Sequence, residues 1–153
     1  MSGTRAPKHS RPKPERPIAS EILPGVFVGG WDDATSFHGQ RVCVLDELPD
    51  EAAPADEHVP IYDAGAGGPI RPNLERIVRI VDEARGRNEP VLLFCGHGVR
   101  RSPLAGAWYL HRHDRIPLDA AYDRLREVRP GIEHVRKWAK HWDVLTEGKG
   151  ASS

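Results

Sequence analysis

The chain is poor in cysteine and has no long apolar run. Its 153 residues hold only two cysteines, Cys43 and Cys95, which are too few for a disulfide scaffold. Such a count suits a reducing compartment, where a free thiol stays reactive. The sequence also lacks a membrane-length apolar run and a secretory leader at its N-terminus. We therefore expect a cytoplasmic protein without a membrane partner.

The chain has no excess of either charge. Lys and Arg together number 22, and Asp and Glu also number 22. This balance argues against a globally basic nucleic-acid binder, so we do not expect a nucleic-acid partner. The eight histidines show no paired spacing typical of a metal site, and we expect neither a metal nor another cofactor. The length is that of one ordinary domain, which we expect to be a monomer.

Both ends of the chain differ in composition from the middle. Residues 1–18 are rich in proline and basic side chains and carry few apolar ones. Such a segment buries too little apolar area to offset its ordering entropy, which favours a solvated, disordered leader over a docking arm. Residues 147–153 form a polar, glycine-containing tail. The predicted domain is therefore residues 19–146.

Short apolar runs alternate with helical patterns in the middle of the chain. Strands are predicted at residues 26–28, 42–45, 59–62 and 91–94, and helices are predicted from Pro72, from Ser102-Pro103 and after Pro117. Val135, Trp138, Trp142 and Leu145 form a last apolar stripe of helical spacing. Continuous apolar strands are typical of sheets covered on both faces. The prediction is a single α/β domain with a central, mostly parallel, twisted sheet flanked by helices.

The most informative segment joins the strand at 91–94 to the helix at Ser102. A glycine-rich loop between a strand's carboxyl end and a helix's amino end directs backbone N–H groups at one point and forms an anion site. The same field favours the thiolate of Cys95 as a nucleophile. Arg101 can grip two phosphate oxygens at once. Gly96 and Gly98 permit backbone conformations that side chains would block, and the Ser102 hydroxyl can hydrogen-bond the Cys95 sulfur.

The segment from Cys95 to Ser102 resembles the Cys-x5-Arg-Ser/Thr phosphate loop of the protein tyrosine phosphatases, and most closely that of their dual-specificity branch. Residues 22–29, 105–110, 120–121 and 129–130 also look like that branch, so the resemblance covers roughly residues 20–145. It implies a protein tyrosine phosphatase-like fold and a phosphocysteine intermediate on Cys95. The implied phosphate-binding residues are Gly96, His97, Gly98, Val99, Arg100 and Arg101. Ser102 would steady the sulfur as a leaving group.

The family supplies a general acid from an aspartate about thirty residues before the cysteine. Asp63 lies 32 positions upstream, after a predicted strand, and the resemblance implies that it protonates the leaving oxygen. Asp50 and Asp56 lie in a segment that is typical of a solvated connector. Asp63 could instead be a turn or cap residue, but the carboxyl end of a strand is where sites gather in α/β folds.

Phe94 is a departure, because the family usually has histidine directly before the cysteine. The loop amides and Ser102 must then support the thiolate alone, and we expect it to be less stabilised than in histidine-bearing relatives. Cys43 lies inside a predicted strand. Some relatives form a protective disulfide with such a second cysteine, but plain burial is the favoured interpretation. The Arg100 side chain is interpreted as a surface charge, and that of His97 as either a rim or a solvated residue.

The predicted activity is hydrolysis of phosphotyrosine in a phosphorylated protein, with phosphoserine and phosphothreonine left open. RNA 5'-triphosphatases of the superfamily share the Cys-x-His-Gly start of the loop, but they tend to lack the acid. Phosphoinositide and inositol phosphate phosphatases are a further alternative, although their loops are usually more basic. An inactive phosphopeptide-binding module is the non-enzymatic alternative, which only Phe94 supports.

Overall fold

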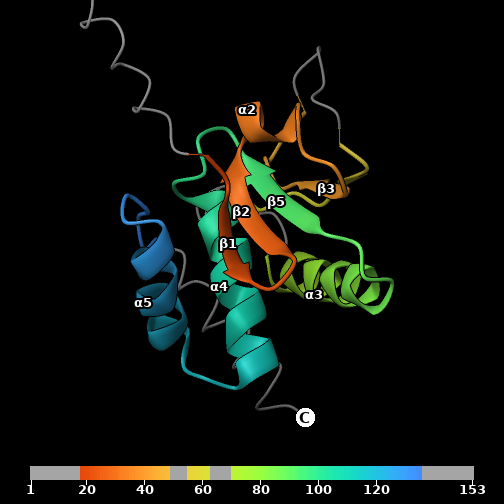
Figure 1. Ribbon diagram of the computed structural model, residues 1–153. Helices are drawn as coiled ribbons and strands as arrows, with labels where there is room; N and C mark the ends of the chain where they lie inside the picture. The colour runs from red at the N-terminus through yellow and green to blue at the C-terminus, as the bar shows by residue number, and fades with distance from the viewer. Residues whose placement is uncertain (1–17, 49–54, 63–69, 136–153) are drawn as a thin grey trace, which may run out of the picture.

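The computed structural model describes residues 18–48, 55–62 and 70–135 (Figure 1). Its strands are β1 (Ser20–Leu23), β2 (Val26–Gly30), β3 (Gln40–Cys43), β4 (Glu57–His58) and β5 (Val91–Cys95). Its helices are α2 (Trp31–Ala34), α3 (Arg71–Gly86), α4 (Arg101–Asp114) and α5 (Leu118–Val128). No helix in these described ranges is long and apolar enough to cross a membrane.

The five strands form one sheet in the order β1-β2-β5-β3-β4. The β1–β2 pair is antiparallel, and the β2–β5, β5–β3 and β3–β4 pairs are parallel. This arrangement confirms the predicted α/β fold with a mostly parallel sheet. Because β5 lies at the centre, the loop that follows Cys95 leaves from the middle of the sheet edge, where parallel α/β sheets hold their sites.

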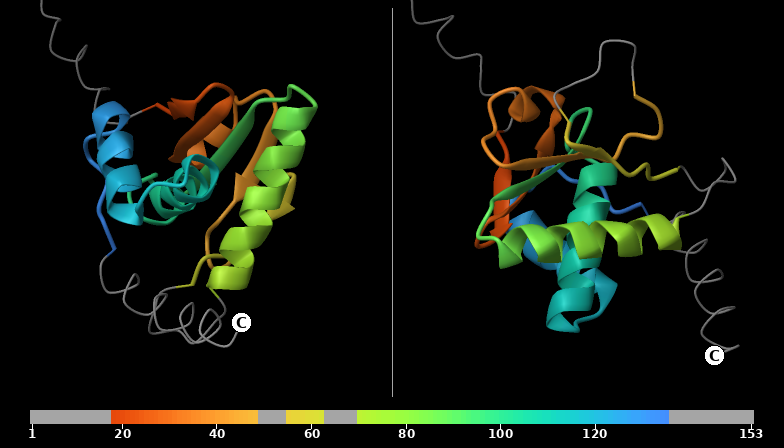
Figure 2. Two further views of the ribbon diagram at one scale, coloured as in Figure 1. Left: turned by 90° about the horizontal axis from the view of Figure 1, so that it is seen from below. Right: turned by 90° about the vertical axis from the view of Figure 1, so that its right-hand side faces the viewer.

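The sheet is covered on both faces. Every residue of β5 is buried, which explains its continuous apolar sequence. Helices α3 and α4 cover one face, where Leu93 and Cys95 join the main core with residues of both helices. Leu92 and Phe94 face the other way and pack with Ala34 of α2. Figure 2 shows α3, α4 and α5 on one side of the sheet, with α4 in the middle.

Helix α4 lies very close to the sheet. A Cβ atom on Gly106 would lie 2.7 Å from Cγ2 of Val28 on β2, so only glycine fits at this contact. Along the rest of the helix, residues 102–110 are all buried. On its outer side, α4 packs against α5 through a second apolar cluster that includes Tyr122 and Leu125. Both ends of the loop that begins at Cys95 are therefore held by buried structure.

Two sequence expectations differ from the structure in detail. Residues 59–62, predicted as a strand, follow the short β4 without strand geometry, although the Val59 and Ile61 amides still donate to the Cys43 and Val44 carbonyls at 3.0 and 3.1 Å. Pro60 between them has no N–H to continue a ladder. The last apolar stripe, beyond Val135, lies outside the described residues, as do most of the predicted leader and the predicted tail.

Candidate active site

The site is built around the Cys95 sulfur at the end of β5. Cys95 is only 5% exposed, and its Sγ accepts a hydrogen bond from the Ser102 backbone N–H at 3.4 Å. The thiol in turn donates to the Ser102 hydroxyl at 3.3 Å. That hydroxyl donates to the Gly29 carbonyl of β2 at 2.9 Å. The sulfur therefore lies at the amino end of α4, with a buried hydroxyl beside it that is anchored to the neighbouring strand.

The sequence prediction of a helix start at Ser102 is wrong by one residue. Helix α4 begins at Arg101 with Arg100 at the N-cap, and no side chain caps it. The Ser102 hydroxyl, which could have capped the helix, is used on the sulfur and on β2 instead. Pro103, in the third helical position, has no N–H. The N–H groups at the start of the first turn are thus those of Arg101 and Ser102, next to the thiol.

The loop carbonyls between β5 and α4 all accept hydrogen bonds from outside the loop. Gly96 O accepts from the Trp31 amide at 2.9 Å, Val99 O from the Glu133 amide at 2.8 Å, and Arg100 O from the Leu104 amide at 3.1 Å. The Arg129 guanidinium donates to Gly98 O at 2.9 Å and to His97 O at 3.4 Å. In a trans peptide, the carbonyl and the next amide point in opposite directions. The amides of residues 97–101 are therefore turned inward, which is what an anion nest requires.

Gly98 is the loop position where only glycine fits. Its φ is +72°, in the left-handed region. A Cβ atom there would also clash with Nη2 of Arg129 and would lie 2.8–2.9 Å from the Gly29 backbone. The loop crosses closely over β2 at this point, and a side chain would push it outward.

Arg101 emerges from the first turn of α4 with its side chain 19% exposed. Its Nε donates to the Ile61 carbonyl at 2.7 Å, which holds the side chain in place beside the loop. Its Nη2 lies 3.5 Å from Oδ2 of Asp46, a half-exposed carboxylate after β3. The long contact to Asp46 is one that a bound phosphate can replace, because a dianion is the stronger partner for a guanidinium.

The other predicted loop residues contribute backbone rather than side chains. Arg100 has a 58% exposed side chain that pairs with Glu133 at 3.2 Å, as expected for a surface charge. His97 is exposed, and Gly96 and Val99 are partly buried. Only the peptide groups of these residues are placed to face an anion. That Arg100 and its neighbours bind phosphate stays a prediction, and it concerns their amides.

Phe94 and Cys43 both lie on the face of the sheet opposite to Cys95. Phe94 is fully buried and makes an edge contact with the Trp31 ring at a centroid distance of 6.2 Å. Cys43 is buried beside it, and both cysteines are free. Burial raises the pKa of the Cys43 thiol, the Leu45 backbone lowers it, and the negative charge of Cys95 raises it again. The structure thus gives Cys43 a packing role.

The predicted general acid, Asp63, lies outside the described residues, as does Asp50. Asp56 is paired with Arg41, whose Nε lies 3.3 Å from its Oδ2, and it is therefore part of the sheet edge. Two residues near the loop were missed by sequence reasoning, Arg129 and Asp46. Arg129 was noted only as part of a family-like Arg-Pro pair, and Asp46 follows a predicted strand, which is the one signal that could have drawn attention to it.

Comparisons with known proteins identify the family of the chain. Residues 51–147, more than half of the chain, match the family model for the dual specificity phosphatase catalytic domain. The chain belongs to this family. Dual specificity phosphatase 28 from Homo sapiens is 25% identical over 142 residues, which cover 87% of this chain and 80% of the relative. Dual specificity protein phosphatase 12 from Mus musculus is 28% identical over 129 residues, covering 73% of this chain and 36% of the relative.

The solved structures agree with the fold of this family. The crystal structure of human DUSP28 superposes with a TM-score of 0.69 at 21% identity, covering 85% of this chain and 96% of the other. The mouse and human phosphatase 12 sequences extend well beyond the match, because the chain spans only about a third of their length (36% in both). The predicted membership in the dual-specificity branch, which was based on the loop from Cys95 to Ser102, is thereby confirmed for family and fold.

Proposed function

We propose that this protein is a metal-independent phosphatase that hydrolyses phosphotyrosine, and also phosphoserine or phosphothreonine, in proteins through a phosphocysteine intermediate on Cys95. The observation that carries the proposal is the loop itself. Five successive carbonyls are turned away from the Cys95 sulfur, so five amides face the space in front of it. Such preorganised donors stabilise charge that develops on a transferring phosphoryl group.

The first step is attack of the Cys95 thiolate on phosphorus. The S–P bond forms as the bond from phosphorus to the substrate oxygen breaks, and the electron pair leaves with that oxygen. Arg101 and the loop amides hold the three equatorial oxygens. Asp63, placed by its spacing in the family pattern, donates the proton that the leaving oxygen needs.

The second step releases phosphate. Water attacks the phosphocysteine and gives a proton to the Asp63 carboxylate, while the S–P bond breaks and its electron pair returns to the sulfur. Ser102 is suited to this step, since its hydroxyl lies 3.3 Å from Sγ. To donate to the thiolate, the hydroxyl would turn from the Gly29 carbonyl, which now accepts from it.

The test is phosphate release from p-nitrophenyl phosphate in EDTA by the wild type, Cys95→Ser and Cys43→Ala. Activity is expected to survive chelation, to vanish in Cys95→Ser and to persist in Cys43→Ala, because Cys43 lies on the opposite face of the sheet. Acid quenching with a labelled substrate should trap a phosphoenzyme that accumulates in Asp63→Asn. Loss of activity on chelation, or full activity in Cys95→Ser, would contradict the mechanism.

A panel of phosphotyrosine, phosphoserine and phosphothreonine peptides, inositol phosphates and 5'-triphosphorylated RNA would separate the substrate classes. The protein substrates are favoured by family membership. A binding module is the second candidate. It draws support from Phe94, which packs against Trp31 and stands where the family usually has a histidine, directly before the nucleophile. Tight phosphopeptide binding without turnover of any substrate would favour it over the enzyme.

A further inference from the structure

We propose that Arg129 is a positioning residue of the phosphate loop, holding the loop carbonyls outward and adding positive potential behind the nest. The inference rests on the proposed function, because it assigns a role in phosphate binding at the same site. Arg129 follows the last residue of α5 and is 31 residues from Gly98 in sequence. It is not part of the Cys-x5-Arg segment.

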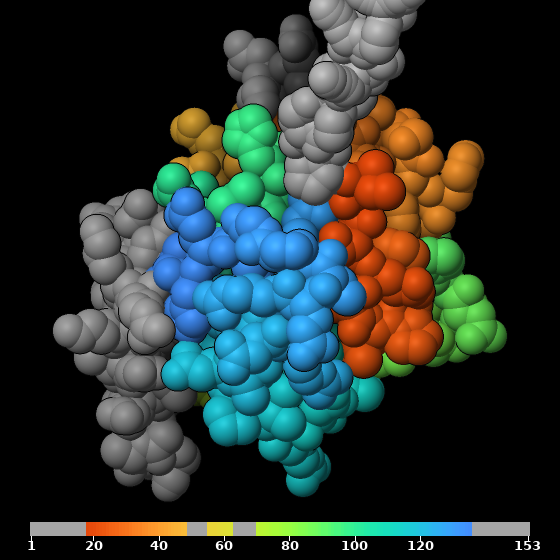
Figure 3. All heavy atoms as spheres, turned by 60° about the vertical axis from the view of Figure 1, so that its left-hand side comes forward, coloured from red at the N-terminus to blue at the C-terminus, as the bar shows by residue number. Residues whose placement is uncertain are grey.

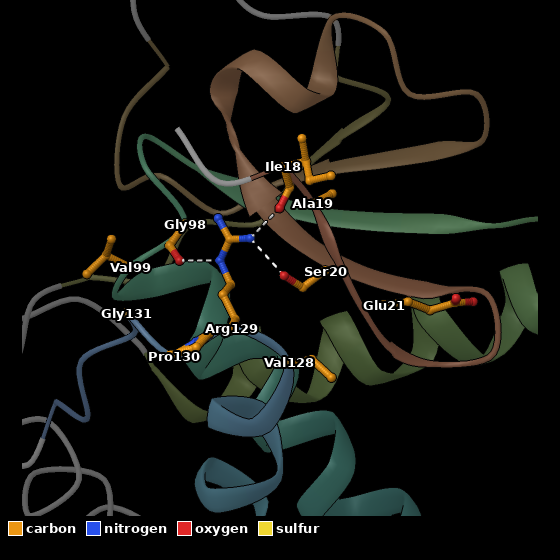
Figure 4. A pocket seen from close by; sticks show the side chains of 10 residues that line it. All are labelled: Ile18, Ala19, Ser20, Glu21, Gly98, Val99, Val128, Arg129, Pro130 and Gly131. Carbon is orange, nitrogen blue, oxygen red and sulfur yellow. Dashed lines mark hydrogen bonds between the residues drawn. The ribbon is translucent and has the colours of Figure 1, made fainter. Parts of the chain in front are cut away.

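The Arg129 guanidinium bridges two parts of the molecule that are far apart in the chain. On one side it donates to the Gly98 carbonyl at 2.9 Å and to the His97 carbonyl at 3.4 Å. On the other side, Nη1 donates to the Ile18 carbonyl at 2.7 Å and to the Ser20 hydroxyl at 3.0 Å. Figure 4 shows the guanidinium between the loop and the start of β1. Figure 3 shows that α5 and β1 adjoin on this side of the molecule.

A lysine could not make this set of contacts. Guanidinium presents five N–H donors in a rigid planar fork, whereas an ammonium is a compact point charge. Two of the four acceptors are successive loop carbonyls, and holding both outward turns the amides of Gly98 and Val99 inward. The approach to Gly98 is close, since a Cβ there would clash with Nη2. Arg129 therefore holds the loop at Gly98, where the left-handed φ and the close contact leave the backbone little freedom.

The charge of Arg129 is buried and is not neutralised by its hydrogen-bond acceptors. The residue is 4% exposed, and its four acceptors are three carbonyls and one hydroxyl, all neutral. Burying a cation among neutral groups carries a desolvation cost, so a packing role alone would be served better by an apolar side chain. The positive charge lies on the carbonyl side of peptide groups whose amides face the proposed anion site. The electrostatic potential of the charge and that of the amides therefore both favour a bound anion.

Nearby groups oppose the cost of burial. Burial lowers the pKa of the Arg129 guanidinium, while the negative charges of Asp33 on α2 and of the Cys95 thiolate raise it. The Arg129 cation and the Cys95 thiolate therefore attract each other. Other charged groups near the loop are Arg101, which pairs with Asp46, and the surface pair of Arg100 and Glu133. Glu21 lines the pocket beside Arg129. That pocket, about 460 Å³, is otherwise lined mainly by apolar residues.

The experiment compares Arg129→Met and Arg129→Lys with Arg126→Met, all in a Cys43→Ala background where Cys95 is the only thiol. Arg126 lies on the same helix and is paired at the surface with Asp123, which makes it a matched control for loss of one cation. The readouts are the pH profile of Cys95 alkylation by iodoacetamide, binding of inorganic phosphate by calorimetry, and the melting temperature. None of them requires turnover.

For Arg129→Met, the alkylation profile should move to higher pH, and phosphate affinity should fall by about tenfold or more. Arg129→Lys should change the alkylation profile less than it changes the phosphate affinity. Lysine keeps the positive charge but lacks the planar guanidinium that binds both loop carbonyls. Arg126→Met should change neither. A lower melting temperature in both Arg129 variants, with unchanged alkylation and phosphate binding, would reduce Arg129 to a structural residue and overturn the proposal.

Ser20→Ala gives a milder test that does not depend on the folding of Arg129→Met. It removes one anchor of the guanidinium and leaves both loop carbonyl contacts in place. A several-fold loss of phosphate affinity is expected, and full affinity in both Ser20→Ala and Arg129→Lys would contradict the proposal. A wild type that binds phosphate and alkylates readily without turnover would overturn the proposed function and leave the role of Arg129 standing.

Discussion

Single residues in the phosphate loop divide into those that act through the backbone and those that act through the side chain. The Ser102 hydroxyl lies beside the Cys95 sulfur and ties it to β2, while the Arg101 guanidinium is held by the Ile61 carbonyl. Gly98 acts by having no side chain. Arg100 carries a charge that points elsewhere, to Glu133. The Cys-x5-Arg spacing alone does not separate these roles, because it reports positions along the chain and not directions.

Gly98→Ala should impair phosphate binding more than stability. The left-handed φ costs an alanine about 1–2 kcal/mol, and the loop must also move away from Arg129 and Gly29. We expect phosphate affinity, measured by calorimetry, to fall by about tenfold or more, because the inward amides lose their alignment. Gly86→Ala is the matched control, since a Cβ at Gly86 meets nothing within 4 Å. Equal phosphate affinity in the two variants would contradict the role given to Gly98.

At the scale of elements, α3 and α4 are joined by a polar contact beneath the sheet. The Tyr109 hydroxyl donates to Oδ1 of Asp82 at 2.5 Å and accepts from Arg85 at 3.2 Å. The Arg85 guanidinium also lies over the Tyr109 ring, 6.0 Å from its centroid. Because α4 carries Arg101 and Ser102 at its other end, this contact helps to fix the direction from which the helix meets the loop.

Tyr109→Phe should lower the free energy of unfolding by about 1 kcal/mol at pH 7, since both hydrogen bonds are lost. Burial and the hydrogen bond to Asp82 raise the pKa of Tyr109, while Arg85 lowers it. A raised pKa means that this residue's stabilisation is present below the ordinary tyrosine pKa of about 10 and is lost as pH rises through the folded-state value. Urea unfolding at neutral and alkaline pH should therefore show the two proteins converging above about pH 10. A difference in the free energy of unfolding between wild type and Tyr109→Phe that grows at alkaline pH would contradict this role of the Tyr109 hydroxyl.

At the scale of the whole molecule, the phosphate loop gathers contacts from most of the fold. Its carbonyls are held by α2, by Arg129 at the end of α5 and by Glu133, and Arg101 reaches the segment after β4. An anion that binds this loop binds the folded state only. Ligand binding should then stabilise the entire domain and not just the loop.

Inorganic phosphate should raise the melting temperature in a concentration-dependent way. At a phosphate concentration of about 100 times the dissociation constant, the free energy of unfolding should rise by about 2.7 kcal/mol. Cys95→Ser should keep most of this gain, because the amides and Arg101 hold the anion. Arg101→Met should lose it, whereas Arg100→Met should retain most of it, since the Arg100 side chain is engaged with Glu133. Differential scanning fluorimetry would check this, and equal losses in Arg100→Met and Arg101→Met would contradict the geometry.

Much of the architecture followed from local sequence pattern. Buried strand β5 was evident from Val91–Phe94, and the helices after Arg71, Arg101 and Pro117 were evident from their apolar spacing. These signals are local because a covered strand must be continuously apolar and a helix facing a core must repeat its apolar residues. The segment at 59–62 was misread because its pattern is that of a strand, while Pro60 interrupts the hydrogen-bond ladder.

The sequence by itself determined which residues to propose as nucleophile and phosphate-gripping arginine, Cys95 and Arg101, because one short run of consecutive residues carries both. Only the tertiary structure decided which way the loop's carbonyls point and what holds them there. Trp31 comes from one distant part of the chain and Arg129 and Glu133 from another, and nothing in local spacing relates them to Cys95. The segment from Cys95 to Arg101 supplies the amides of the nest, but the surrounding fold sets their orientation. Each loop carbonyl turns toward the hydrogen-bond donor that tertiary packing places next to it.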